Sequence, residues 1–162
     1  MKDKMADGNV KLSQYIISRD LRGVRKILDD FPQLNLEHRE ILHGLQTPPM
    51  RICHCNFTPH DTSDLLNVML LRRYDVNIQD GDGKTLLSHA CIAQKTEVLE
   101  LLSDLELCYC NPNIPDNDGN TPLFFAVRSR NPVFVDDFVN CFMANSLNVH
   151  HRNLNGRECG VY

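Results

Sequence analysis

The strongest constraint on the fold of this chain is an internal repeat. The stretch NIQDGDGKTLLSHAC at residues 77–91 returns, with substitutions, as NIPDNDGNTPLFFAV at residues 113–127. The glycine of the turn recurs after 36 residues, as Gly83 and Gly119. Self-similarity with a period of 20–50 residues is typical of arrays in which each unit packs against its neighbours. We therefore expect a stack of similar units.

The same period extends toward both ends of the chain. The segment LNVHHRNLNGRE at 147–158 repeats the spacing of asparagine and glycine, and LQTPPMRIC at 45–53 supplies another Thr-Pro pair. Farther back, IISRDLRGVRKIL at 16–28 matches ACIAQKTEVLELL at 90–102 without gaps. Four periods and the opening of a fifth fill the sequence.

Each part of the repeat has a physical reason. Asp-x-Asp-Gly favours a tight turn, because aspartate hydrogen-bonds to turn backbone and glycine adopts positive φ without a steric cost. Thr121 then stands where a helix N-cap is expected, with its hydroxyl accepting from a free amide, and Pro122 follows at the first helical position. A second apolar helix pattern follows. One such helix pair cannot bury its own apolar face, so neighbouring pairs must stack.

The repeated segments resemble ankyrin repeats, whose pattern is Asp-x-x-Gly-x-Thr-Pro-Leu-His-x-Ala followed by a second helix. The resemblance implies an all-α solenoid of stacked helix-turn-helix units joined by β-hairpin-like turns, with about four repeats and a partial fifth. It places a polar N-terminal tail at 1–9 and an ankyrin-repeat domain at 10–162. The expected units are 10–36, 41–77, 80–113, 116–148 and the partial unit 151–162.

The chain departs from the family pattern at several positions. Ser88 and Phe124 stand where the family has its histidine, so we expect no histidine to tie either turn. Asp137 occupies a position that is normally apolar in the second helix, and the second unit carries extra residues at 54–64. These departures predict repeats that are less stable than a consensus array.

The acidic turns do not fit a calcium loop. An EF-hand loop requires oxygen ligands at positions 1, 3, 5 and 12 around a glycine at position 6. With Gly119 at position 6, Ile114 and Phe125 fall on positions 1 and 12, and neither side chain carries an oxygen. The other turn fails in the same way, with Ile78 and His89 at these positions. We expect no metal at either turn.

The cysteines are interpreted as free thiols. The chain has seven cysteines and no secretory signal segment, which indicates a reducing compartment. Cys53-His54-Cys55 and Cys108-Tyr109-Cys110 invite a zinc interpretation, but structural zinc sites usually have Cys-x2–4-Cys spacing with a matching second pair. A buried small side chain is the simpler role, so we expect no metal and no cofactor.

Composition narrows the possible functions. A net charge of −4 disfavours nucleic acid as a partner, and no segment is long and apolar enough to span a membrane. The chain lacks a Gly-x-Ser-x-Gly elbow, a glycine-rich phosphate loop and a His-Glu-x-x-His motif. Cysteine–histidine catalysis stays open, because such partners meet in space rather than in sequence. We predict a cytoplasmic or nuclear protein that is not an enzyme.

The resemblance implies a protein–protein interaction module whose concave turn and first-helix face binds a partner protein. An alternative is a short inhibitor resembling the inhibitors of Rel/NF-κB transcription factors or their viral mimics. The family's variable positions fall here on Gly81, Asp82, Lys84, Ile92, Ala93, Asn117, Asp118, Asn120, Arg128 and Ser129.

Two further expectations concern modification and assembly. Asn77 resembles the hairpin asparagine that is hydroxylated in some ankyrin proteins. The last unit stops before a complete helix pair, so the segment FVDDFVNCFM at 134–143 is expected to be partly exposed. Such a patch would favour self-association through the uncapped C-terminal repeat.

Overall fold

The computed structural model describes residues 2–38 and 44–160, with side chains from Asp7 onward. The regular elements of this part of the chain are helices, and isolated bridge residues occur at Gln46 and at Arg152, which pairs antiparallel with Glu158. The helices are α1 (Lys2–Ile17), α2 (Leu21–Asp30), α3 (Pro48–Ile52), α4 (Pro59–Leu70), α5 (Leu86–Ala93), α6 (Thr96–Ser103), α7 (Pro122–Arg128), α8 (Pro132–Phe142) and the 3-10 turn η2 (Met143–Asn145).

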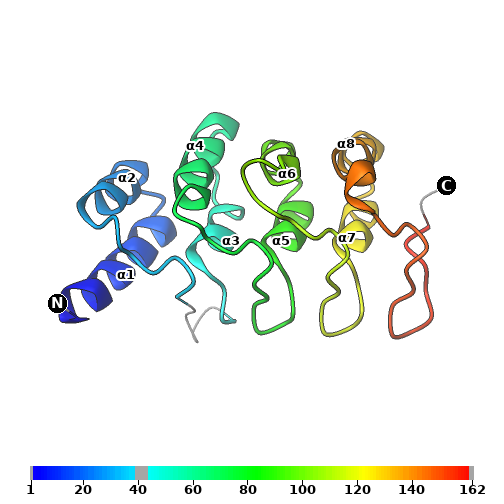
Figure 1. Ribbon diagram of the computed structural model, residues 1–162, viewed down its shortest axis with the longest axis horizontal. Coiled ribbons are helices and arrows are strands. Elements are labelled where there is room, and N and C mark those ends of the chain that lie inside the picture. Colours follow the sequence, from blue (N-terminus) through cyan, green and yellow to red (C-terminus); the bar gives the residue numbers. More distant parts are fainter. Residues whose placement is uncertain (1, 39–43, 161–162) are drawn as a thin grey trace.

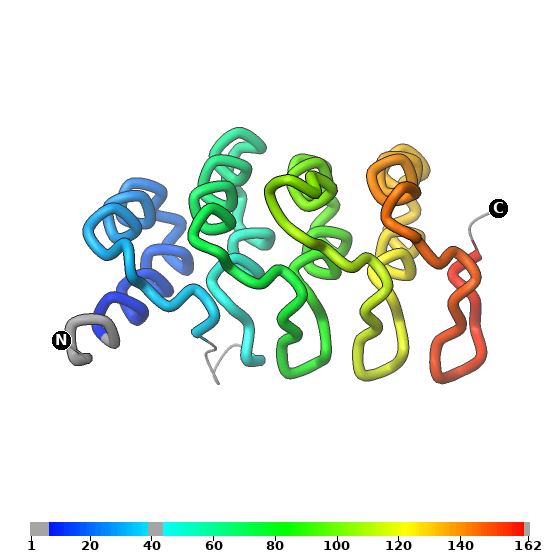
Figure 2. The backbone as a smooth tube through the Cα atoms, viewed as in Figure 1, coloured from blue at the N-terminus to red at the C-terminus, as the bar shows by residue number. Residues whose placement is uncertain are grey.

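The helices form a solenoid of stacked pairs, which confirms the predicted fold class. Figure 1 shows α1–α2, α3–α4, α5–α6 and α7–α8 side by side along the long axis. The first helices pack in one row, with α5 against α7, and the second helices pack in another, with α6 between α4 and α8. The loops between units project to one side, and the last of them lies at the C-terminal end (Figure 2).

One apolar core runs through all four helix pairs. The first helices contribute fully buried side chains such as Leu12, Met50 and Leu87, and the second helices contribute Leu99 and Phe138. Burying one such side chain stabilises the fold by about 1.5–3 kcal/mol, so no pair is stable without the faces of its neighbours.

The N-terminal segment differs from its prediction. Residues 2–9, expected as a polar tail, belong to α1. Gly8 explains why the helix extends this far: a Cβ added there would lie 2.9 Å from Leu34 Cδ1 and 3.7 Å from the Phe31 ring. The helix therefore packs closely on the segment that follows α2. The start of the second predicted unit, 41–43, and the end of the fifth, 161–162, lie outside the described residues.

The N-caps of α5 and α7 differ from each other, and one of them differs from its prediction. Thr85 accepts a hydrogen bond from the amide of Ser88 at 3.3 Å, as an N-cap should. Thr121 has the extended backbone of an N-cap, but its buried hydroxyl has no hydrogen-bond partner among the described residues. The predicted capping bond of Thr121 is therefore wrong, although α7 still begins at Pro122 as expected.

At the C-terminal end, the described chain after η2 forms a hairpin without a helix. Within the segment expected to be partly exposed, Phe134, Phe138 and Phe142 point inward and are at most 2% exposed, whereas Met143 is 62% exposed. No described helix is long and apolar enough to cross a lipid bilayer.

Candidate protein-binding surface

The third and fourth units use the same turn. Asp80 accepts from the amides of Asp82 at 3.0 Å and Lys84 at 2.8 Å, and Asp116 accepts from the equivalent amides of Asp118 and Asn120 at the same two distances. The turn glycines have φ of +81° at residue 83 and +80° at residue 119, which other residues adopt only with strain. The turn chemistry expected from the sequence is therefore present in both units.

Most predicted residues of the turns hold neighbouring turns together. The amide of Gly81 donates to the carbonyl of Gly44 at 2.8 Å. Asn117 donates from its amide to Asp82 O and from its side chain to Gly81 O, both at 3.0 Å. Asn120 accepts from the side chain of Asn153 at 2.9 Å. These contacts form a hydrogen-bonded ladder between successive turns.

Charged groups at the tips remain accessible. The Asp82 side chain is 75% exposed and forms an ion pair with Lys84 at 2.9 Å. Asp118 is exposed, while its carbonyl accepts from the amide of Leu154 at 3.1 Å. The tips can thus offer charge to a partner through Asp82, Lys84 and Asp118, whereas the asparagines serve the array itself.

Asn77 is also held by the array. Its side-chain nitrogen donates to Tyr109 O at 2.7 Å, and its oxygen accepts from the amide of Asn111 at 2.9 Å. Asn113 makes the equivalent pair of contacts one unit later, with Ser146 and Asn148. The asparagine thus links each unit to the next, and its modification stays a prediction.

The predicted helix residues form a different group. Ile92, Arg128 and Ser129 lie with Phe125 around a hollow of about 290 Å³, which we call the apolar hollow. It lies where α5 and α7 pack together. Ile92 is 42% exposed, although it is a large apolar side chain on a helix whose other face is buried. Ala93, the fourth predicted helix residue, is half-buried.

A second hollow lies between the first two units. It measures about 420 Å³ and we call it the basic hollow. Its lining comes from the end of α1, the turn before α2, and the region of α3. The residues are Ile16, Ile17, Arg19, Gln46, Arg51, His54 and Cys55.

Sequence reasoning missed this second hollow, although the repeat contained the signal. Thr47 precedes Thr85 by 38 residues, and the same offset carries His54 onto Ile92 and Cys55 onto Ala93. The Cys53-His54-Cys55 motif points only to a metal site, whereas the offset of 38 residues gives His54 the exposed position of Ile92. Arg19 could be found in the same way, because the gapless match of 16–28 to 90–102 places it opposite Ala93.

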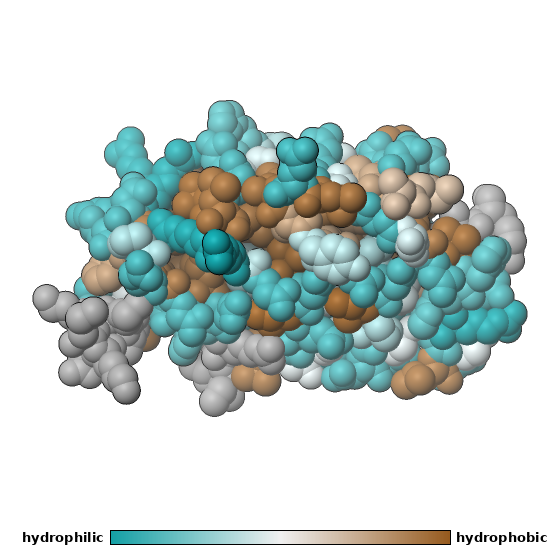
Figure 3. Space-filling model, viewed as in Figure 1, coloured by the Kyte–Doolittle hydropathy of each residue, from teal (hydrophilic) through white to brown (hydrophobic). Residues whose placement is uncertain are grey.

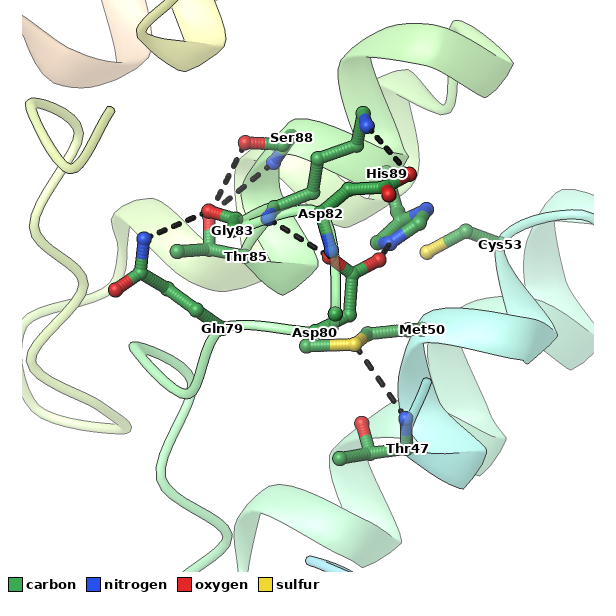
Figure 4. Close-up of polar contacts among 12 residues, drawn as sticks. Thr47, Met50, Cys53, Gln79, Asp80, Asp82, Gly83, Thr85, Ser88 and His89 are labelled. Atoms are coloured by element: carbon green, nitrogen blue, oxygen red, sulfur yellow. Dashed lines mark hydrogen bonds and ion pairs between the residues drawn. The ribbon is translucent and has the colours of Figure 1, made fainter. Parts of the chain in front are cut away.

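A chain of hydrogen bonds connects the second and third units at His54. The Nε2 atom of buried His89 lies 2.8 Å from Asp80 Oδ2, and its Nδ1 atom lies 2.8 Å from Nε2 of His54. Figure 4 shows the Asp80 carboxylate between its own turn and the His89 ring. An ionised Asp80 requires a proton on Nε2 of His89, so in a neutral ring Nδ1 accepts and His54 donates.

This contact corrects one expectation. Ser88 occupies the family's histidine position, and we expected no histidine to tie the turn. In the third unit, His89 does so instead, because the next residue of α5 also reaches Asp80. In the fourth unit Phe125 stands at this position, and the expectation is not contradicted there.

The charges of Asp80 and His54 follow from their surroundings. Burial alone would raise the pKa of Asp80, but hydrogen bonds from His89 and from the amides of Lys84 and Asp82 outweigh it and hold the pKa below its ordinary value. Burial, and to a smaller degree the charge of His89, lowers the pKa of His54. A negative Asp80 and a neutral His54 are therefore favoured near pH 7.

Burial makes four of the seven thiols less reactive. Burial raises the pKa of Cys53 to about 12, and that of Cys108 to about 11. It also raises the pKa of Cys91 and Cys110, so these sulfurs stay protonated and unreactive near neutral pH. Across the described part of the chain, no group of three or more His, Cys, Asp or Glu side chains is placed to hold a metal ion.

Comparison with known proteins agrees with this architecture. A family model described as ankyrin repeats in three copies matches residues 51–152. The chain is similar to a fowlpox virus protein named as an ankyrin repeat protein, with 23% identity over 107 residues, 66% of this chain and 17% of the relative. It is also similar to the nuclear factor NF-kappa-B p110 subunit of Drosophila melanogaster, with 24% identity over 131 residues, 81% of this chain and 12% of the relative.

The chain thus spans less than a fifth of the length of either relative. The family model covers more than half of the chain, and its match runs from α3 to the start of the hairpin that follows α8. Stacked helix pairs, repeated Asp-Gly turns and this match lead to one assignment: the chain belongs to the ankyrin-repeat family.

Proposed function

We propose that this chain is a non-enzymatic module that binds another protein along the face formed by its first helices and the charged tips of its turns. Ankyrin repeats are a protein–protein interaction fold, which supports the general class of function. The finer proposal concerns which face binds and which residues carry the contact.

One observation carries the proposal. His54, Ile92 and Arg128 occupy the same position in three successive units, and all three are exposed. The residue before the first two of them, Cys53 or Cys91, is fully buried. A continuous exposed row beside buried core positions, with a hollow at each end, gives a partner a surface that crosses several units.

The roles of the predicted residues differ within this face. Ile92, Arg128 and Ser129 surround the apolar hollow and are the proposed centre of contact with the partner. Asp82 and Lys84 form a charged rim, and such groups affect association rate and selectivity more than affinity. Gly81, Asn117 and Asn120 position the turns, so substitutions there would disturb the array as well as any contact.

A function by binding alone is supported by the state of the thiols. Burial raises the pKa of Cys53 and Cys91, and neither sulfur would serve as a nucleophile near neutral pH. We propose a cytoplasmic or nuclear location for the module, and a protein rather than nucleic acid or a membrane as its partner.

Site-specific photo-crosslinking tests the proposed face. A benzophenone amino acid replaces Ile92 or Arg128 on the first-helix face, and Val133 on α8, which is 67% exposed, as a matched control. In cells, we expect one discrete crosslinked product from positions 92 and 128 and none from position 133. Equal crosslinking from all three positions would contradict the proposed face.

A second candidate function is inhibition of Rel/NF-κB transcription factors. The similarity to the Drosophila p110 subunit favours it, because that protein is itself a nuclear factor NF-kappa-B subunit. A nuclear-translocation assay of a Rel/NF-κB factor, with and without the chain, tests this candidate. Retention of the factor in the cytoplasm that is lost with Ile92→Glu would support it, and unchanged translocation would reject it.

Two smaller proposals concern Asn77 and self-association. Mass spectrometry of the chain purified from cells would show a gain of one oxygen on Asn77 if that residue is hydroxylated. Light scattering would show a concentration-dependent mass if the C-terminal repeat self-associates. A shallow cavity of about 350 Å³, lined by Val127, Val135 and Gly160 among others, lies at that end of the stack.

A further inference from the structure

The basic hollow between α1 and α3 concentrates positive charge on a chain that is negative overall. Arg19 and Arg51 line it together with His54, which is neutral near pH 7, and none of the described lining residues is acidic. The chain as a whole carries a net charge of −4. A positive site on a chain of negative net charge favours a negatively charged group of a partner.

The pKa of Cys55 responds to the positive charges around this hollow. Burial raises the pKa of its thiol, while Arg19, Arg51 and Lys95 each act in the opposite direction by favouring the thiolate. Three cations therefore act on one buried atom of the wall. The Cys55 sulfur is not itself the acceptor of a ligand, because it points to the carbonyls of Ile16 and Arg51 at 3.4 and 3.5 Å.

The wall of the hollow is held in place. His54 is hydrogen-bonded through Nε2 to His89, which is fixed in turn by Asp80. Ile16, at the end of α1, is 1% exposed, so its side chain belongs to the core while its carbonyl anchors Cys55. A preformed wall reduces the cost of ordering side chains when a ligand binds.

We propose that the basic hollow binds a carboxylate side chain of a partner protein, with Arg19 as the contact residue, Arg51 as a second cation of the wall and His54 as a neutral polar part of it. This inference rests on the proposed function, because it names the chemistry of the partner on the same first-helix face. Arginine matches the two oxygens of a carboxylate with paired N–H donors. The acidic tips at Asp82 and Asp118 disfavour a doubly charged phosphate more than a single carboxylate.

The apolar hollow indicates a second feature of the partner segment. It lies between the third and fourth units, two units beyond the basic hollow. Packed helices lie roughly 10 Å apart, so the two hollows are separated by roughly 20 Å. An extended chain advances about 3.3 Å per residue. The partner segment therefore carries an aspartate or glutamate and, about six residues away, a large apolar side chain.

Figure 3 shows an apolar area on the viewed face over α4 and α6. Val68 of α4 and Leu71 directly after it are exposed apolar side chains. The hollow that Val68 lines also has Arg25, Asp29 and Asp64 in its lining, so it does not select one sign of charge. The two hollows of the first-helix row are more selective, because one is basic and the other apolar.

Peptide display tests the inference on the full chain. Random peptides of twelve residues are selected against the immobilised protein, and the enriched peptides are synthesised and measured by fluorescence anisotropy. We expect enrichment of an acidic residue about six positions from a large apolar residue. Arg19→Glu is expected to weaken these peptides about tenfold at low salt, and this loss should shrink as salt rises.

Two controls make the outcome specific. Lys26→Glu introduces the same change of charge at an exposed position of α2 and should alter affinity less than about twofold. Replacing the peptide's Glu by Gln should cause the same loss as Arg19→Glu, and the two changes together should cost little more than either alone. Circular dichroism of Arg19→Glu should remain helical, because Arg19 is exposed and already has positive φ.

The possible failures can be distinguished. Peptides that lose binding with Ile92→Glu but not with Arg19→Glu would overturn the carboxylate site and leave the proposed function standing. Peptides that bind equally to both variants would overturn the proposed function as well. Equal losses with Arg19→Glu and Lys26→Glu would show attraction by general charge and reject the site. Competition by inorganic phosphate but not by acetate at equal ionic strength would replace the carboxylate with a phosphate and reject the inference as stated.

Discussion

The third and fourth turns share one backbone design but differ in how they join the array. Asp80 and Asp116 accept from equivalent amides at matching distances. The second oxygen of Asp80 then accepts from His89, whereas among the described residues that of Asp116 has only a 3.4 Å contact with the side chain of Asn120. The third turn is therefore linked to its own first helix and, through His54, to the preceding unit.

This difference separates two sources of stability. The local motif Asp-x-x-Gly is sufficient to form the turn, because its donors and acceptor lie within five residues of sequence. The connection between the turn and the stack depends on one side chain of the first helix. A single change at position 89 or 125 should then alter the coupling between units without altering the turn.

The largest expected effect comes from removing the turn carboxylates. Asp80→Ala should cost about 4 kcal/mol of unfolding free energy, and Asp116→Ala about 2 kcal/mol. Both lose the acceptor of two amides, but only Asp80→Ala also leaves a buried histidine, 3% exposed, without its partner. Urea denaturation followed by circular dichroism measures both. Equal losses would remove the distinction between the turns.

A smaller effect is expected from His89→Phe, which copies the residue of the fourth unit. It should cost about 2 kcal/mol, because Asp80 Oδ2 and His54 each lose a hydrogen-bond partner. The reciprocal change Phe125→His should cost less, since it places an imidazole near the carboxylate of Asp116. Thermal unfolding of both variants tests this order, and a larger loss for Phe125→His would contradict it.

The helix caps give a third test of the same two units. Thr85→Ala should cost about 1 kcal/mol, because the hydroxyl accepts from the amide of Ser88. Thr121→Ala should cost much less, since the Thr121 hydroxyl is buried and has no hydrogen-bond partner among the described residues. Chemical denaturation of the two variants under one condition compares them directly, and similar losses would show that Thr121 also acts as a cap.

The smallest effect is a dependence of stability on pH. The pKa of His54 is lowered below its ordinary value of 6.5 in the fold, chiefly by burial. The unfolded chain therefore binds a proton at His54 more readily, and the stability from this group is present above pH 6.5 and lost as pH falls through the folded pKa. His54→Gln should flatten this part of the curve of unfolding free energy between pH 7.5 and 5.5. If the slope of unfolding free energy against pH is the same in His54→Gln, the pKa of His54 is not lowered in the fold.

A second pH dependence follows from Asp80. Hydrogen bonds from His89 and two amides outweigh burial and hold its pKa below the ordinary value of 3.8. The unfolded chain then takes up this proton first, so the contribution is present above about pH 4 and is lost as pH falls through the folded pKa. Asp80→Asn should remove this acid limb.

Much of the fold followed from the sequence. The spacing of Gly83 and Gly119, the Thr-Pro helix start and the apolar second helices gave the repeat, the helix pairs and the solenoid. Ile92, Arg128 and Ser129 were found by position within the repeat and lie together around one hollow. These features are periodic along the chain, and a periodic signal can be detected without knowledge of contacts.

Other features could not be found in this way. The polar character of residues 1–9 predicts a tail, yet Gly8 of α1 packs against Leu34, which follows α2. Asn117 and Asn120 hydrogen-bond to neighbouring turns, which the repeat pattern does not indicate, and their contact with a partner stays a prediction. A side chain at a turn tip faces either a partner or the next turn, and the sequence pattern is the same in both cases.

The sequence by itself determined the unit, because a turn, an N-cap and an apolar helix face are properties of residues within about 36 positions of one another. Stacking decided what lies between units. His54 meets His89, and Arg19 shares a hollow with His54, only when separate units come side by side. Each of these contacts joins residues about one repeat apart, and a repeat pattern specifies positions within a unit but not which side chains meet across the boundary.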